Sequence, residues 1–147
     1  MGASSFDLAL QSPSRASLST DTVYYMVVEE GDWTMPDGTL IEAGTIDDGT
    51  VAYKNNWSGT TVSFASSFSA APVVFHNVMT YNDSDWIDSV IFSPGSRTSP
   101  PTTSGFDVSL NGAEAVTSHS TETIGWIAIE QGLSLIHISE PTRRYRI

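Results

Sequence analysis

The stretch TETIGWIAIEQG, residues 121–132, is typical of a buried β-strand that ends at a turn. A close counterpart, TDTVYYMVVEEG, stands at residues 20–31, 101 positions earlier (121 − 20 = 101). Both segments carry apolar side chains at consecutive positions, which predicts a strand covered on both faces at the centre of a sheet. The sequence pattern of a central strand therefore occurs twice in the chain.

The two segments align without a gap, and the similarity extends upstream, where SSFDLAL (4–10) matches TSGFDVSL (103–110). The matching pairs are Thr20/Thr121, Asp21/Glu122, Thr22/Thr123, Val23/Ile124, Glu29/Glu130 and Gly31/Gly132. A period of about 100 residues fits a complete small domain better than a solenoid unit. We predict that residues 1–31 are the C-terminal part of a preceding repeat and that residues 32–132 form one whole domain.

The last residues have a different character. Residues 133–147, LSLIHISEPTRRYRI, contain three of the six basic residues and have no counterpart after Gly31. The stretch resembles translated sequencing-adapter read-through, so we interpret it as a non-native tail and leave it out of the fold reasoning.

Composition narrows the classes of partner. The formal net charge is −11, which disfavours binding to nucleic-acid phosphates or to anionic membrane surfaces. The chain has no cysteine, so disulfide and thiol chemistry are absent. There is no apolar run long enough to span a membrane and no secretory leader pattern in residues 1–20.

Short runs of β-branched and aromatic residues alternate with Gly, Pro, Asn, Asp and Ser throughout, and helical periodicity is absent. Predicted strands cover residues 23–29, 39–46, 51–54, 60–65, 72–80, 86–92, 106–110 and 123–130. Asp-Gly turns are expected at 37–38 and 48–49. Strands 72–80 and 124–129 are apolar on both faces and are predicted to be central. The expected fold is an all-β antiparallel sandwich of about six strands.

Three blocks carry a family resemblance: IEAGTIDDG (41–49), TTVSFASSFSAAPVVFHNVMT (60–80), and SGFDVSL with ETIGWIAIE (104–110, 122–130). Together they resemble the H-type lectin domain, and more closely its bacterial tandem-repeat relatives. The resemblance implies a six-stranded antiparallel sandwich, frequently trimeric, with a sugar site at the subunit junction. In the animal lectins of the family that site recognises terminal N-acetylgalactosamine.

The family's ligand contacts do not carry over. Their positions fall on Val51, Tyr53, Asp88, Glu114 and Ser120, none of which keeps the family residue. The resemblance thus implies a fold and a set of loops, without the N-acetylgalactosamine preference.

Sugar sites combine an aromatic surface with carboxylates and amides that bind hydroxyl groups. Three predicted loops offer such side chains. For any single residue a solvated loop position or packing at the edge of the core is the simpler interpretation, and the loops as a set are the predicted site. The candidate carbohydrate-binding residues are Asp48, Tyr53, Asn55, Trp57, Asp85, Trp86, Asp88, Glu114 and His119.

Other chemistry receives less support. Asp83, Asp85 and Asp88 could offer oxygen ligands to calcium, but the terminal Glu of a calcium loop is missing and a solvated acidic turn is the simpler interpretation. Enzyme motifs are absent, and His119 with Glu122 is weak support for acid/base catalysis. We predict no enzyme activity, no cofactor and no bound metal.

Two functions remain open. The first is a carbohydrate-binding, lectin-like module of a larger bacterial repeat protein, extracellular or at the cell surface, that acts in adhesion or glycan recognition. The second is a structural spacer or assembly domain with no sugar binding. Residues 23–29 are expected to pair as an added strand with the whole domain or a neighbouring chain. The chain is thus expected to form a homo-oligomer, which the resemblance implies to be a trimer, or a strand-addition assembly.

Overall fold

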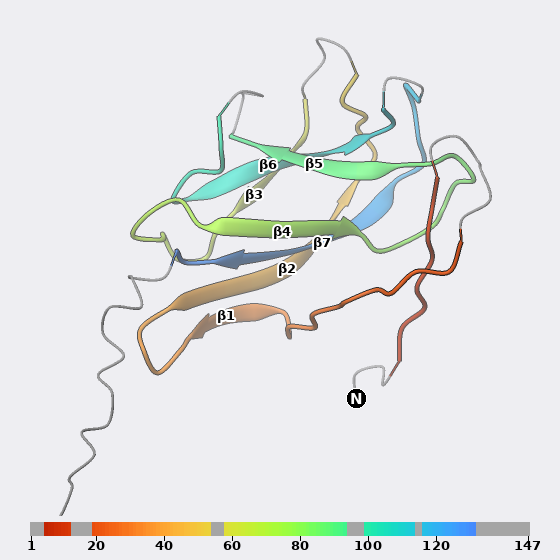
Figure 1. The fold of residues 1–147 in the computed structure, drawn as a ribbon. Coiled ribbons are helices and arrows are strands. Elements are labelled where there is room, and N and C mark those ends of the chain that lie inside the picture. Colours follow the sequence, from red (N-terminus) through yellow and green to blue (C-terminus); the bar gives the residue numbers. More distant parts are fainter. Residues whose placement is uncertain (1–4, 13–18, 54–57, 94–98, 114–115, 132–147) are drawn as a thin grey trace, which may run out of the picture.

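The computed structural model describes residues 5–12, 19–53, 58–93, 99–113 and 116–131. Within these ranges the fold is all-β, with two antiparallel sheets and no helix, as Figure 1 shows. The strands are β1 (Gly31–Thr34), β2 (Leu40–Asp48), β3 (Thr60–Ser63), β4 (Val73–Val78), β5 (Asp88–Phe92), β6 (Gly105–Asn111) and β7 (Glu122–Ile129). The predicted all-β sandwich is confirmed, with seven strands.

The sheets divide the strands unequally. One sheet has the order β1-β2-β7-β4, and the other has the order β3-β6-β5. β7 lies between β2 and β4 and pairs with both along its length, from Asp48↔Glu122 to Ile41↔Ile129 on one side and from Val78↔Ile124 to Val73↔Ile129 on the other. The motif in residues 121–132 therefore forms a central strand, as predicted.

Alternation along β7 builds the core between the sheets. Ile124, Trp126 and Ala128 point inward and are 0%, 8% and 0% exposed. Opposite them, Phe106 of β6 stacks edge-on against Trp126 at a ring-centroid distance of 5.6 Å. Burying a large apolar side chain contributes roughly 1.5–3 kcal/mol each, so this layer accounts for much of the fold's stability.

Close packing explains one glycine of β2. A Cβ on Gly44 would lie 2.8 Å from Cζ2 of Trp126, which is too close for any side chain. Gly44 pairs directly with Trp126 across β2 and β7. The indole therefore needs a glycine beneath it on the neighbouring strand.

The Asp-Gly turn at residues 37–38 joins β1 to β2. Gly38 has a φ of +88°, a left-handed conformation that favours glycine, and its N–H donates to the Met35 carbonyl at 2.8 Å. β1 itself was not predicted, because four residues with a Gly and an Asp carry little strand signal of their own and depend on pairing with β2.

Three sequence predictions are corrected. Residues 23–29 form no strand, and they pair with no strand of the domain. Residues 72–80 contain β4, which is an edge strand of its sheet rather than a central one. In residues 51–54, Val51 makes an isolated bridge to Leu110 in place of a strand, and Lys54 lies outside the described residues.

The predicted alternation in residues 60–65 is confirmed. Val62 is buried and Phe64 packs on the core, whereas Thr61 and Ser63 are exposed. The predicted tail 133–147 lies outside the described residues.

Candidate functional site

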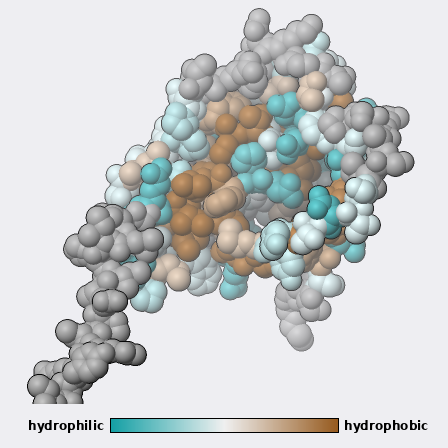
Figure 2. Space-filling model, in the orientation of Figure 1, coloured by the Kyte–Doolittle hydropathy of each residue, from teal (hydrophilic) through white to brown (hydrophobic). Residues whose placement is uncertain are grey.

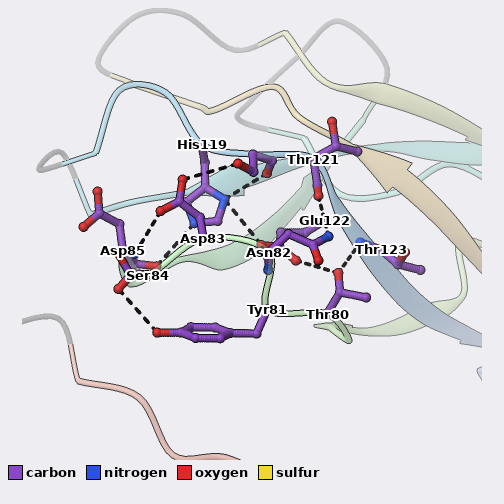
Figure 3. A network of polar contacts seen from close by, with 11 residues as sticks. Thr80, Tyr81, Asn82, Asp83, Ser84, Asp85, His119, Thr121, Glu122 and Thr123 are labelled. Atoms are coloured by element: carbon purple, nitrogen blue, oxygen red, sulfur yellow. Dashed lines mark hydrogen bonds and ion pairs between the residues drawn. The ribbon is translucent and has the colours of Figure 1, made fainter.

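A network of polar contacts joins two connections at one end of the sandwich, and Figure 3 shows it from close by. One connection is the segment 79–87 between β4 and β5, and the other is the segment 116–121 that precedes β7. Glu122 is the first residue of β7 and is 1% exposed. Its carboxylate accepts hydrogen bonds from the Asn82 backbone N–H at 2.7 Å and from the Thr80 hydroxyl at 2.5 Å. We call Glu122, Thr80, Asn82 and the hydrogen bonds that join them the Glu122 network.

Further bonds fix the same two segments to each other. The Asn82 side-chain amide donates to the Thr121 carbonyl at 2.9 Å, and the Thr123 N–H donates to the Thr80 hydroxyl at 2.7 Å. Hydrogen bonds to a charged group contribute about 1.5–3 kcal/mol each, so a buried carboxylate with two such donors is a strong anchor. Residues 80–82 are therefore held in one conformation.

His119 connects the network to Asp85. Its Nε2 lies 3.3 Å from the Asp85 carbonyl oxygen, and its Nδ1 lies 2.9 Å from the Ser120 carbonyl oxygen. Nδ1 also lies 3.6 Å from the Glu122 carboxylate. The structure thus brings together two of the predicted site residues, Asp85 and His119, which are 34 positions apart in sequence.

Asp83 supplies a carboxylate at the surface of the network. It accepts a hydrogen bond from the Asp85 N–H at 3.3 Å and from the Ser120 hydroxyl at 3.4 Å. The Asp85 N–H holds the pKa of Asp83 below its ordinary value, and the Ser84 N–H and His119 lower it further against the opposing effect of desolvation. Asp83 therefore presents a negative charge at neutral pH.

Tyr81 gives the site an aromatic surface. Its side chain is 65% exposed, and its hydroxyl donates to the Ser84 carbonyl at 3.4 Å. Because Tyr81 stands between Thr80 and Asn82, which the Glu122 network holds, the backbone beneath the ring is fixed on both sides. An exposed ring can stack on an apolar face of a ligand, and a carboxylate on the same loop can accept bonds from its hydroxyl groups.

The other predicted site residues lie elsewhere or differ in exposure. Asp48 is 2% exposed, and its carboxylate accepts bonds from the hydroxyls of Thr50 and Thr60, so it acts inside the fold. Trp86 and Tyr53 are partly buried, and Asp88 is exposed at the start of β5. Asn55, Trp57 and Glu114 lie outside the described residues.

No group of three or more His, Asp or Glu side chains within the described ranges is placed to hold a metal ion. The acidic residues at 83, 85 and 88 are among those described. The described residues likewise include no helix with the length and apolarity needed to cross a membrane.

Sequence reasoning weighed Glu122 only as half of an acid/base pair and missed that it anchors the loop. A signal for that role was present, since Asp21 and Glu122 place an acid at the same position of the two aligned segments. An acid kept at the buried start of a central strand indicates an internal partner.

No family model matches this chain, and no solved structure matches it. Over 119 residues, 78% of this chain, it is 34% identical to halomucin of Haloquadratum walsbyi. The match spans 1% of the length of halomucin, so this chain is similar to one small part of a very long protein.

Proposed function

We propose that this chain is a non-catalytic carbohydrate-recognition module of a long surface repeat protein, and that residues 81–85 make the contact. The observation that carries the proposal is the exposed Tyr81 ring on a loop fixed by the buried Glu122 carboxylate. A preformed surface loses little conformational freedom on binding, which favours recognition by a small site.

Two further observations support the proposal that the module belongs to a long surface repeat protein. Similarity to 1% of halomucin points to a surface or extracellular protein in which such a domain is one part of many. The repeated motif at residues 20–31 and 121–132 agrees with a tandem arrangement. Repetition suits weak sugar binding, because linked sites gain avidity through effective concentration. The resemblance to H-type lectin domains supports the same proposal.

The chemistry of residues 81–85 fits a polyhydroxylated ligand. Tyr81 would stack on the apolar face of a sugar ring, while Asp83 would accept hydrogen bonds from ring hydroxyls. The low pKa of Asp83, caused first by the Asp85 N–H, keeps that carboxylate ionised across neutral pH.

A glycan array followed by calorimetry tests the proposal. Tyr81→Ala should abolish binding of any glycan that the wild type retains, with an unchanged melting temperature. Tyr24→Ala is the matched control, because Tyr24 is 92% exposed and lies in the preceding partial repeat. An array without signal for the folded wild type, or equal losses in both variants, would refute carbohydrate recognition at this loop.

A spacer or assembly domain is the second candidate. One observation favours it: the side chains of Val73 and Phe75 on β4 are exposed apolar groups, at 45% and 52%. Assembly without any glycan signal would support this alternative.

A further inference from the structure

The face of the four-stranded sheet that points away from the core is apolar over half of its extent. Register places Trp33, Ile41, Ile129 and Val73 in one row across β1, β2, β7 and β4. The next row along the strands contains Ala43, Ile127 and Phe75. We call these seven side chains the outer face. Figure 2 shows apolar atoms gathered over the same strands.

The outer face is separate from the core. None of its residues belongs to the buried cluster between the sheets or packs against it. Trp33, Val73 and Phe75 are 44%, 45% and 52% exposed, whereas Ile41, Ile127 and Ile129 are half-buried and Ala43 is buried at 6%. The other half of the same sheet surface is mostly polar, with Thr45, Asp47, Asn77 and Thr123, although the exposed Met79 lies against Gly125 there. Exposed apolar side chains gathered on one face of a strongly acidic domain mark an interaction surface.

The aligned segment earlier in the chain, residues 20–31, keeps the same character. In β7 the outward positions of the two rows are Ile127 and Ile129, and their counterparts in residues 20–31 are Met26 and Val28. A strand that faced water on that side would place polar residues there. An apolar outer face is therefore a property of the repeat rather than of one copy.

Charge limits the choice of partner. The chain has a net charge of −11, yet no charged residue stands in either row of the outer face, and Glu29 lines a hollow at its β1 edge. Two acidic molecules repel each other over most of their surfaces and can approach where carboxylates are missing. A basic partner would instead be drawn to the acidic surfaces, which lie elsewhere.

Shape points to a second copy. A shallow hollow of about 260 Å³ lies at the β1 edge of the outer face, lined by Val28, Glu29, Trp33, Met35 and Ile41. The exposed side chains of Val73 and Phe75 stand at the opposite edge, on β4. A twofold axis parallel to the strands, between β2 and β7, would set β4 of each copy over β1 of the other. Each hollow would then face a ridge, as an isologous interface requires.

We propose that two copies of this domain pack through their outer faces, sheet against sheet, in a twofold pair. Aligned sheets pack about 10 Å apart, which leaves one interdigitated layer of side chains between the copies. The pairing is independent of glycan binding, because the Glu122 network lies at the end of the sandwich and outside the two rows.

Analytical ultracentrifugation of the full chain tests the pairing, in 0.15 M and 2 M NaCl. The protomer mass is 15.8 kDa, so the expected pair has 31.6 kDa (2 × 15.8 = 31.6), and screening by salt should tighten it. Phe75→Glu should weaken association at least about tenfold, since it adds a desolvated charge to the interface. Asn77→Glu is the matched control, an outward residue of the same strand in the polar half, and should leave the pair intact.

Circular dichroism and melting temperature must show that both variants fold. A wild type that stays monomeric at high concentration in both salts, a three-copy mass, or equal losses in the two variants would overturn the proposal. Val27→Pro separates strand addition by residues 23–29 from face packing. Association lost in Val27→Pro and retained in Phe75→Glu would also overturn it.

Discussion

Residues 20–31 and 121–132 carry nearly the same sequence pattern in two different structural states. In the second segment, β7 is a central strand with partners on both sides. In the first, residues 20–29 form no strand, and Tyr24 and Tyr25 are 92% and 71% exposed. Tyr25 corresponds to Trp126, which is 8% exposed. The comparison teaches that the pattern specifies what a strand can bury, whereas neighbouring strands decide whether it forms.

The first segment does contact other described residues. Phe6 meets Tyr25 edge-on at a ring-centroid distance of 5.1 Å, and the Trp33 indole N–H donates to the Glu29 carbonyl at 3.2 Å. Val23, Met26 and Val27 remain 39–74% exposed. The segment therefore leaves much of its apolar surface exposed, because no strand of the domain pairs with it.

Hydrogen exchange would measure the largest difference between the two segments. Amides of β7 should exchange at least about a thousandfold more slowly than those of residues 23–29, since core strands open only with the whole domain at roughly 5 kcal/mol or more. Mass spectrometry of peptides from each segment reads both in one experiment. Comparable protection in the two would mean that residues 23–29 find a partner in solution.

Substitutions at the aligned positions 25 and 126 should differ strongly in their effect on stability. Trp126→Ala should destabilise the domain by about 3–5 kcal/mol, because it empties the aromatic layer between the sheets. Tyr25→Ala, at the aligned position, should change stability by less than about 0.5 kcal/mol. Urea denaturation followed by fluorescence gives both values. A loss of several kcal/mol in Tyr25→Ala would show that the first segment is part of the cooperative fold.

The acidic residues at the aligned positions 21 and 122 also lie in different surroundings, and substituting them should change stability by smaller amounts. Glu122→Gln should cost about 2 kcal/mol, as the carboxylate's charged hydrogen bonds to Thr80 and Asn82 become neutral ones. Asp21 lies in an exposed segment, where its carboxylate accepts only the local Thr22 N–H at 2.8 Å among the bonds described, so Asp21→Asn should be neutral. Thermal melts check the pair, and equal shifts would remove Glu122 as an anchor.

The alternation of apolar residues in the sequence predicted where the strands lie. β2, β3, β4, β5, β6 and β7 all begin and end within about two residues of the predicted ranges, because alternation reports which face is buried. β4 was placed wrongly at the centre, since its second apolar face is the outer face and not a second core layer. Alternation cannot distinguish an apolar side covered by the fold from one left exposed.

The candidate site was likewise predicted only in part from the sequence. Residue chemistry identified Asp85 and His119, which the structure joins, and also Asp48, which the structure buries. The anchor was missed because Asn82 and Glu122 are 40 positions apart, and only the pairing of β4 with β7 brings their segments together. Contacts set by strand register are not encoded in any local pattern.

The smallest expected effect on stability concerns β4, which pairs with β7. Residues 20–29 have no such partner strand. His76 pairs with Trp126 across β4 and β7, and its Nδ1 lies 2.8 Å from the Ser89 hydroxyl oxygen. Burial lowers the pKa of His76 below its ordinary value, although the negative charge of Asp88 partly opposes this. The unfolded chain therefore binds a proton that the folded domain resists between the lowered pKa and about 6.5.

Stability should accordingly fall as pH drops below about 6.5. Partial exposure of the imidazole keeps the effect below about 1 kcal/mol. His76→Gln removes the titrating group while keeping a polar side chain, so its stability should change less than that of the wild type between pH 7 and pH 5. Urea denaturation at both pH values makes the comparison. Parallel pH profiles for the two proteins would mean that the acid sensitivity arises from groups other than His76, and that the contact between β4 and β7 does not depend on a neutral imidazole.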